Sequence, residues 1–259
     1  MPVFNLPSVL IYPITYAIVP LLSKAYIRKD VKSASEIETA SLKITSILAF
    51  PCAFGIGVFS QPILSAIFEE SSAILGSPYV SVLSPGIVFM CLLATTNAIL
   101  QARGKQIKPI FSMLTAAALK LVIDFFLIGR EEIGMFGAAI GTVVFYFTAT
   151  FLNFCFIVKS GHFTFRVREF LIKPFFISLI AVFCSYVFYR EVYSVFTPVL
   201  VLLLSILIAV FIFIILLLLT GAITENEINY LPLKAKYINA LQAFLGKFQR
   251  EKKKNSSKN

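Results

Sequence analysis

Two charged residues, Lys120 and Asp124, lie inside an otherwise apolar segment and are the first candidates for chemistry. They are four residues apart, so on a helix they share one face and lie within reach of an ion pair. Ionisable side chains are costly in hydrocarbon, and where they occur they often mark a functional site. We therefore predict that this pair lines a polar cavity and meets an anionic group there. The alternative is a self-neutralising pair that lets its helix pack against neighbouring helices.

Two polar side chains, Asn97 and Gln101, have the same spacing near the end of another apolar segment. They are candidates for the same cavity, although hydrogen bonding to neighbouring helices is the favoured interpretation. Gly137 and Gly141 form a GxxxG spacing, which lets two helix backbones approach closely. We predict that these two glycines are helix-packing residues.

The residues typical of enzymes and metal sites are sparse. The single histidine, His162, has no metal-ligating partner near it in the sequence. The four cysteines lie inside apolar runs without a CxxC pair, and we interpret them as small packing residues. Nucleotide-binding glycine loops are absent. We therefore predict no catalytic residue, no metal and no cofactor, and we expect that the protein is not an enzyme.

The composition determines which elements carry these residues. Apolar residues make up 58% of the chain, charged residues 14%, and the mean hydropathy is +0.88. Soluble domains contain about 25% charged residues, so lipid must surround much of this chain. The predicted fold class is an all-α polytopic membrane helix bundle with about seven transmembrane helices. The predicted spans are residues 3–23, 43–68, 80–102, 109–129, 135–158, 174–189 and 195–222. The second span contains Pro51 and Pro62, and we expect it to kink or to end in a short tilted helix.

Basic residues, which give the chain a net charge of +10, gather in every second connection between these spans and in the tail. Lys43 and Arg103 are assigned to such connections. The positive-inside rule then predicts an amino terminus outside and a carboxyl terminus in the cytoplasm. Because apolar runs separate the basic clusters, nucleic acid is not an expected partner.

The tail, residues 223–259, repeats an amphipathic pattern. Leu233, Tyr237 and Leu241 recur at helical spacing between lysines, which predicts a helix lying on anionic membrane lipids. The alternative is a helix that packs on the protein's own loops.

Several stretches, taken in their order and spacing, resemble a known family. They are IVPLLSKA (18–25), Phe50-Pro51 with Gly55 and Gly57, LQARGK (100–105), Lys120 and GAAIGT (137–142). Together they resemble the stage V sporulation protein B and MurJ-type lipid II flippases, which belong to the multidrug/oligosaccharidyl-lipid/polysaccharide exporter superfamily.

The resemblance implies that the chain is the C-terminal half of a two-lobe transporter, whose partner is a missing N-terminal lobe. Residues 1–158 are then five helices of the C-terminal lobe, residues 159–222 two trailing helices, and residues 223–259 a cytoplasmic tail. The implied task is moving undecaprenyl-linked peptidoglycan or polysaccharide precursors across the bacterial cytoplasmic membrane by alternating access, in cell-wall or spore formation. We expect no transport by this half alone.

Within the resemblance, Lys120 is the remaining candidate for a cavity cation. Two positions depart from the family pattern: Asp124 stands where an amide is expected, and Ala102 stands where a glycine is expected. Three other functions stay open. They are a multidrug exporter of the same superfamily, a seven-helix receptor-like protein, and a membrane glycosyltransferase or ligase.

Overall fold

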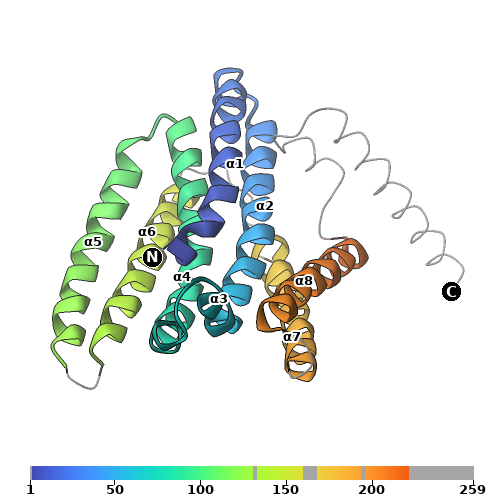
Figure 1. Ribbon diagram of the computed structural model, residues 1–259. Coiled ribbons are helices and arrows are strands. Elements are labelled where there is room, and N and C mark those ends of the chain that lie inside the picture. The colour runs from blue at the N-terminus through green and yellow to red at the C-terminus, as the bar shows by residue number, and fades with distance from the viewer. Residues whose placement is uncertain (1, 131–132, 160–167, 194–196, 222–259) are drawn as a thin grey trace, which may run out of the picture.

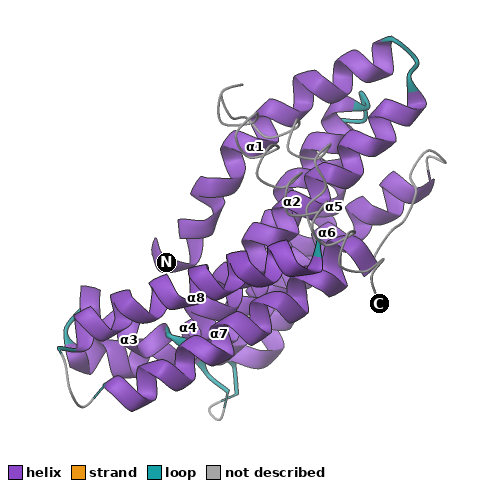
Figure 2. Cartoon of the chain, turned by 90° about the vertical axis from the view of Figure 1, so that its right-hand side faces the viewer, coloured by secondary structure: helices purple, strands orange, loops and turns teal. Residues whose placement is uncertain are grey.

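The computed structural model describes residues 2–130, 133–159, 168–193 and 197–221, and in these ranges every regular element is helical. The elements are α1 (Pro2–Ile27), α2 (Val31–Val58), α3 (Ser60–Ile67), α4 (Glu70–Ala102), α5 (Ile107–Ile128), α6 (Met135–Lys159), the π-helical turn η1 (Arg168–Ile172), α7 (Lys173–Val192) and α8 (Pro198–Thr220) (Figures 1 and 2). Seven of these segments are long and apolar enough to cross a membrane. The predicted fold class is therefore confirmed.

The helices extend beyond the apolar runs that predict them. α2 begins at Val31 rather than at residue 43, since Ala34 and Ile37 are buried against other helices. Asp30 caps this helix by accepting hydrogen bonds from the Ser33 hydroxyl (2.7 Å) and the Ser33 backbone N–H (3.0 Å). These two hydrogen bonds, the hydroxyl first, lower the pKa of the Asp30 carboxyl.

The second predicted span divides into two helices, as its prolines suggest. α2 ends at Val58, Phe59 forms the break, and the short α3 follows. α4 then begins at Glu70, well before the predicted start at residue 80. The tilted helix α3 packs against α4 and α8, which keeps this polar segment in contact with the bundle.

Helices α2 and α4 form the centre of the bundle, and α1 packs against both of them (Figure 1). The hairpin of α5 and α6 lies at one edge, with α6 against α4. The pair of α7 and α8 lies at the other edge, with α7 against α2. α4 is the most buried of the seven spans and α5 the least.

Small and hydroxyl-bearing residues join the central helices. The hydroxyls of Thr45 on α2 and Thr95 on α4 are hydrogen-bonded at 2.7 Å, and both side chains are fully buried. Lipid tails are as apolar as leucine, so close packing and hydrogen bonds between helices, rather than hydrophobicity, hold membrane helices together.

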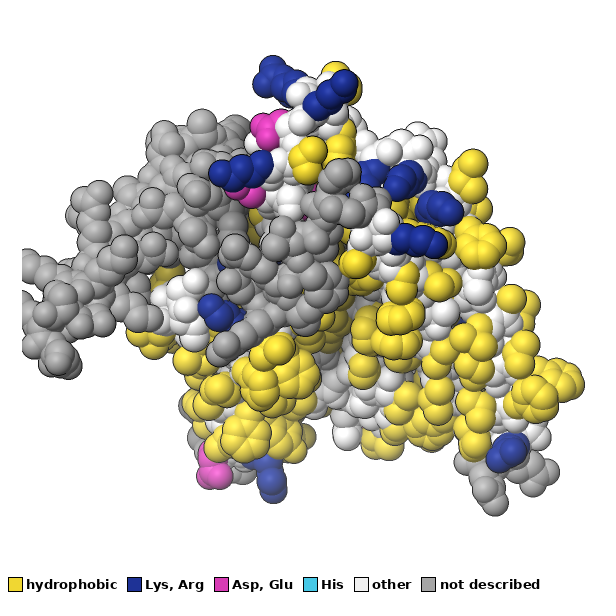
Figure 3. Space-filling view, turned by 180° about the vertical axis from the view of Figure 1, so that it is seen from behind, with side chains coloured by type: hydrophobic (Ala, Val, Ile, Leu, Met, Phe, Trp, Pro, Cys, Tyr) yellow, Lys and Arg dark blue, Asp and Glu magenta, His cyan; other side chains and the backbone are white. Residues whose placement is uncertain are grey.

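Charged residues gather at the two ends of the bundle, on either side of an apolar band (Figure 3). One end carries the basic connections between α1 and α2 and between α4 and α5. The other end carries Glu69, Glu70, Arg130, Arg190 and Glu191. The assignment of the basic end to the cytoplasm stays a prediction. The amphipathic tail at 223–259 and His162 lie outside the described residues.

The GxxxG glycines lie where α6 meets α5. A Cβ atom at Gly137 would lie 2.8 Å from the Leu127 Cβ and 3.0 Å from the Leu127 carbonyl carbon. A Cβ atom at Gly141 would collide with the Asp124 carboxylate. The hairpin therefore requires glycine at both positions for the two backbones to approach.

We predict that Gly137→Ala destabilises the bundle by about 1–3 kcal/mol, because the added methyl overpacks against the α5 backbone. The midpoint of thermal unfolding in detergent should fall. Gly55→Ala is the matched control, since a Cβ at Gly55 meets nothing within 4 Å, and its midpoint should stay or rise. Equal midpoints for the two variants would contradict the packing role.

Candidate functional site

The predicted pair Lys120 and Asp124 faces α6. The Lys120 ammonium lies 2.7 Å from Asp124 Oδ2 and donates a second hydrogen bond to Thr142 Oγ1 at 3.2 Å. The side chains of Lys120 and Asp124 are 29% and 19% exposed. The other carboxylate oxygen of Asp124 is buried against Gly141 and has no hydrogen-bond partner among the described residues. Neither residue lines the two large cavities described below.

This geometry matches the packing interpretation of the pair more closely than the cavity interpretation. The ammonium neutralises the carboxylate on the same helix, and the pair is covered by the glycine face of α6. Two neutralised charges can lie at membrane depth at much lower cost than one. Binding of an outside anion by Lys120 would have to displace Asp124.

Asn97 and Gln101 lie in different environments in the structure. Asn97 Oδ1 accepts a hydrogen bond from Asn153 Nδ2 of α6 at 2.7 Å, and its own Nδ2 donates weakly to the Met113 sulfur of α5 at 3.9 Å. Gln101 is exposed on the end of α4. Asn97 therefore makes interhelical hydrogen bonds, whereas no described hydrogen bond links Gln101 to Asn97 or to Lys120.

An ion pair that the sequence interpretation missed joins four helices at the basic end. The Arg103 guanidinium binds both carboxylate oxygens of Glu38, through Nε at 2.7 Å and Nη2 at 2.6 Å. Their side chains are 4% and 0% exposed. Tyr26 donates a hydrogen bond to Glu38 at 2.5 Å, and Arg103 Nη1 donates to the Ile157 carbonyl at 2.9 Å. The network therefore ties the ends of α1, α2, α4 and α6 together.

The electrostatics of this network favour the charged pair. Burial by itself lowers the pKa of Arg103, but hydrogen bonding and attraction to Glu38, followed by interaction with Tyr26, outweigh it and raise the pKa above its usual value. The planar guanidinium matches the carboxylate in a bidentate geometry. Arg103 therefore stays protonated near neutral pH.

Two of the basic residues assigned to the connections, Arg103 and Lys43, have buried side chains. Arg103 caps the end of α4 with its side chain turned inward, and Lys43 lies within α2 at 4% exposure. The segment before Lys43 is polar enough to resemble a loop. Its buried residues Ala34, Ile37 and Ala40 nevertheless recur at helical spacing, and that periodicity is the signal that predicts the longer helix.

The cysteines are free, and only part of the packing interpretation holds. Cys91 is buried and Cys52 half-buried, whereas Cys155 and Cys184 are exposed on the apolar surface. Within the described ranges, no group of three or more metal-ligating side chains gathers.

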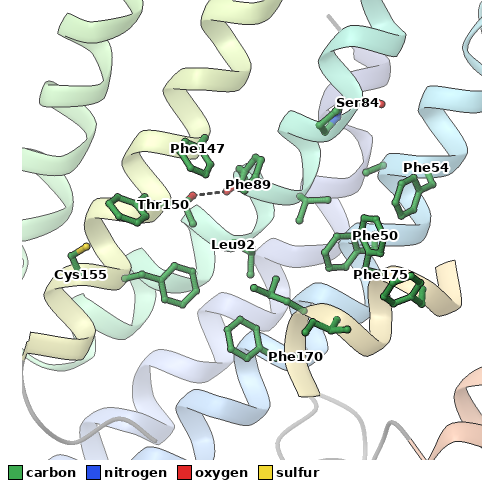
Figure 4. Close-up of a pocket in the computed structure, with 18 of the residues that line it drawn as sticks. Phe50, Phe54, Ser84, Phe89, Leu92, Phe147, Thr150, Cys155, Phe170 and Phe175 are labelled. Atoms are coloured by element: carbon green, nitrogen blue, oxygen red, sulfur yellow. Dashed lines mark hydrogen bonds between the residues drawn. The ribbon is translucent and has the colours of Figure 1, made fainter. Parts of the chain in front are cut away.

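A cavity of about 1000 Å³ lies between α2, α4, α6 and the segment formed by η1 and α7. Figure 4 shows Phe175 next to Phe50, with ring centroids 5.7 Å apart, on one side of the cavity, and Phe89 and Phe147 on another side. Nine phenylalanines contribute to its wall: Phe50, Phe54, Phe89, Phe147, Phe151, Phe154, Phe170, Phe175 and Phe176. We call this space the phenylalanine cavity.

The polar groups in this wall are mostly satisfied. The Thr150 hydroxyl donates to the Phe89 carbonyl at 2.9 Å, so it offers little to a ligand. Lys159, exposed at the end of α6, is the charged residue among the described lining residues. The cavity can therefore hold a long apolar group and can pair its charged end with a cation. Sequence reasoning did not single out this site, although Phe147, Phe151 and Phe154 recur at helical spacing.

Fold and cavity together define a polytopic membrane protein with an apolar binding space inside its bundle. The MatE family model matches residues 1–126, which include α1 through most of α5. MatE proteins are exporters and flippases of the multidrug/oligosaccharidyl-lipid/polysaccharide exporter superfamily and not enzymes. This chain is thus similar to MatE proteins over slightly less than half of its length.

One curated relative is the "Uncharacterized membrane protein YabM" of Bacillus subtilis (strain 168). It is 28% identical to this chain over 152 residues, which are 59% of this chain and 28% of the relative. The matched region thus spans less than a third of the length of that relative.

We predict that breaking the Arg103–Glu38 pair from one side costs about 3–5 kcal/mol, because the remaining charge stays buried without its partner. Arg103→Met and Glu38→Met should each lower the thermal unfolding midpoint in detergent, whereas the double variant should recover much of the loss. Tyr26→Phe, which removes one hydrogen bond, should cost about 1 kcal/mol. A double variant no more stable than the single variants would exclude direct coupling.

A second prediction concerns the pair on α5. Lys120→Met should destabilise the bundle by roughly 1–3 kcal/mol, less than a fully buried pair, because water partly screens the remaining Asp124 charge. Adding Asp124→Asn should restore stability. If Lys120→Met alone left the unfolding midpoint unchanged, the ion pair would not be needed for packing.

Proposed function

We propose that this chain forms the C-terminal lobe of a flippase that moves undecaprenyl-linked peptidoglycan or polysaccharide precursors across the bacterial cytoplasmic membrane by alternating access. The phenylalanine cavity, with Lys159 at its basic end, is the observation that carries the proposal. The resemblance to stage V sporulation protein B and MurJ-type flippases adds the substrate class.

The cavity suits a lipid chain because its wall is apolar and aromatic along its length. Burial there gives an isoprenoid tail little hydrophobic gain, since the tail is already in hydrocarbon. The cavity therefore contributes shape and aromatic contacts to binding of the chain. Affinity must come from the charged headgroup.

The sequence suggested Lys120 as the residue that contacts the headgroup, and we now propose Lys159 in its place. Lys120 is bound to Asp124, whereas Lys159 is exposed, lines the cavity and has no ion pair within the described part of the chain. A pyrophosphate held by Lys159 would lie at the basic end, with its tail among the phenylalanines. In the proposed orientation this end faces the cytoplasm, where such precursors are made.

The proposed partner in transport is an N-terminal lobe. Alternating access needs a second wall that moves against this one. The exposed apolar face of α1, which includes Leu6, Val9 and Leu10, is available to such a lobe or to lipid. The tail at 223–259 is proposed to lie on anionic lipids of the inner leaflet.

A multidrug exporter of the same superfamily is the second candidate, because an aromatic cavity also fits lipophilic drugs. Cationic drugs need an acidic contact, however, and Asp124 is neutralised by Lys120 outside this cavity. The cation at the cavity end favours an anionic ligand instead. The comparisons lend no support to a seven-helix receptor.

Two native cysteines test the lipid site. Cys155 lines the phenylalanine cavity and Cys184 does not, although both are exposed. In phosphatidylcholine nanodiscs, undecaprenyl phosphate should slow alkylation of Cys155 by a lipophilic maleimide severalfold and leave Cys184 unaffected. Peptide mass spectrometry measures both rates.

The same experiment separates the two candidate functions. Lys159→Gln should weaken the protection of Cys155 by undecaprenyl phosphate. Protection by ethidium without protection by undecaprenyl phosphate would favour the drug exporter, and equal slowing at Cys184 would refute a specific lipid site.

A further inference from the structure

A second cavity, of about 820 Å³, opens at the end of the bundle opposite the basic connections. It lies between the end of α2, α3, the first half of α4, the end of α7 and the start of α8. Its described lining is Gly57, Val58, Ser60, Gln61, Pro62, Ser65, Ala66, Glu70, Ser77, Pro78, Ser81, Tyr186, Tyr189, Arg190, Tyr193, Pro198 and Val199. We call it the tyrosine cleft.

One wall of the tyrosine cleft is aromatic and firmly supported. The buried Phe59 ring packs edge-on against Tyr189 (centroids 5.5 Å apart) and Tyr186 (6.2 Å), and Tyr189 contacts Tyr193 at 5.4 Å. Tyr186 and Tyr193 nevertheless remain 37% and 50% exposed. These rings are therefore held in place while part of their surface stays open to a ligand.

The facing wall is polar. Ser81 donates to the Gly57 carbonyl at 3.0 Å and is hydrogen-bonded to Ser60 at 2.7 Å, which fixes α3 against α4. Gln61 and Ser65 on α3, Glu70 on α4 and, beside the tyrosines, Arg190 on α7 are exposed, and within the described part of the chain their side chains make no hydrogen bond or ion pair. Donors and acceptors therefore point to the cleft without being used by the fold.

We propose that the tyrosine cleft binds carbohydrate. A sugar ring presents an apolar face that stacks on tyrosine and a rim of hydroxyls that needs both donors and acceptors. An amide, a hydroxyl, a carboxylate and a guanidinium supply these groups here. A site for phosphate would need an excess of positive charge, whereas Arg190 and Glu70 cancel.

The position of the tyrosine cleft links it to the phenylalanine cavity. Along α2, Phe54 lines the cavity and Gly57 lines the cleft; along α4, Ser84 lines the cavity and Ser81 the cleft. Each step is three residues, ~4.5 Å along a helix. Gly57 and Ser84 meet so closely that a Cβ at Gly57 would collide with the Ser84 hydroxyl. The phenylalanine cavity and the tyrosine cleft are therefore adjacent, and the contact between Gly57 and Ser84 lies between them.

This adjacency fits one amphipathic ligand with its lipid chain in the cavity and its glycan in the cleft, and here the inference rests on the proposed function. Under that function the two contacts are successive positions of one ligand: Lys159 holds the headgroup at the cytoplasmic end before transport, and the cleft receives the glycan at the external end after it. Binding of a free saccharide to the cleft does not depend on transport.

The test uses the full chain in phosphatidylcholine nanodiscs with N,N′-diacetylchitobiose as the probe, measured by saturation-transfer NMR titration. Tyr193→Ala should weaken binding roughly tenfold, because a stacking surface is lost, and Tyr193→Phe should retain most of it. Tyr16→Ala is the matched control, since Tyr16 is 75% exposed on α1 and lies outside the cleft. Thermal midpoints verify that each variant is folded.

Three outcomes would overturn the proposal: no binding of the disaccharide, binding that Tyr193→Ala leaves unchanged, or equal weakening by Tyr16→Ala. Binding of inorganic phosphate that Arg190→Gln abolishes, without saccharide binding, would identify an anion site instead. Saccharide binding without lipid protection of Cys155 would support the cleft and reject the flippase proposal, so the two ideas can fail separately.

Discussion

The ion pair between Arg103 and Glu38 holds together the elements on which the rest of the structure depends. Its two side chains are almost fully buried, and their hydrogen bonds reach α1, α2, α4 and α6. In a bundle surrounded by lipid, hydrophobicity does little to hold helices to one another, so paired polar groups take over that role. A charged side chain buried away from water is stable only beside an opposite charge. Few other residues could therefore replace either partner, and the pairing is specific.

The same constraint distinguishes structural polar residues from candidate functional ones. Lys120 and Asp124 satisfy each other and face α6, and Asn153 joins Asn97 and Thr96 inside the bundle. The fold uses these groups. Lys159 and the exposed groups of the tyrosine cleft (Gln61, Ser65, Glu70 and Arg190) are different, because their side chains have no hydrogen bond or ion pair within the described part of the chain. A group that the fold does not need is the better candidate for a ligand.

The two cavities divide the bundle into an apolar compartment and a polar one. Phenylalanines from α2, α4, α6 and α7 enclose the first, and α3 with the ends of α7 and α8 encloses the second. The break of the second predicted span at Phe59 creates this division, since it turns α3 aside and lets Phe59 support the tyrosines. The helix break at Phe59 thus places the ring that supports the tyrosines and also places α3 at the edge of the cleft.

The sequence by itself determined the seven spans, the alternation of charge along the chain and the close approach at Gly137 and Gly141. These features are local: hydropathy over about 20 residues is enough to predict a span, and GxxxG spacing requires one helix face. The tertiary structure alone decided that Arg103 turns inward to Glu38, that Asp124 packs against Gly141 of α6 instead of lining a cavity, and that phenylalanines from four segments enclose one space. Those features join residues far apart in the chain, and which helix faces meet depends on the packing of the whole bundle.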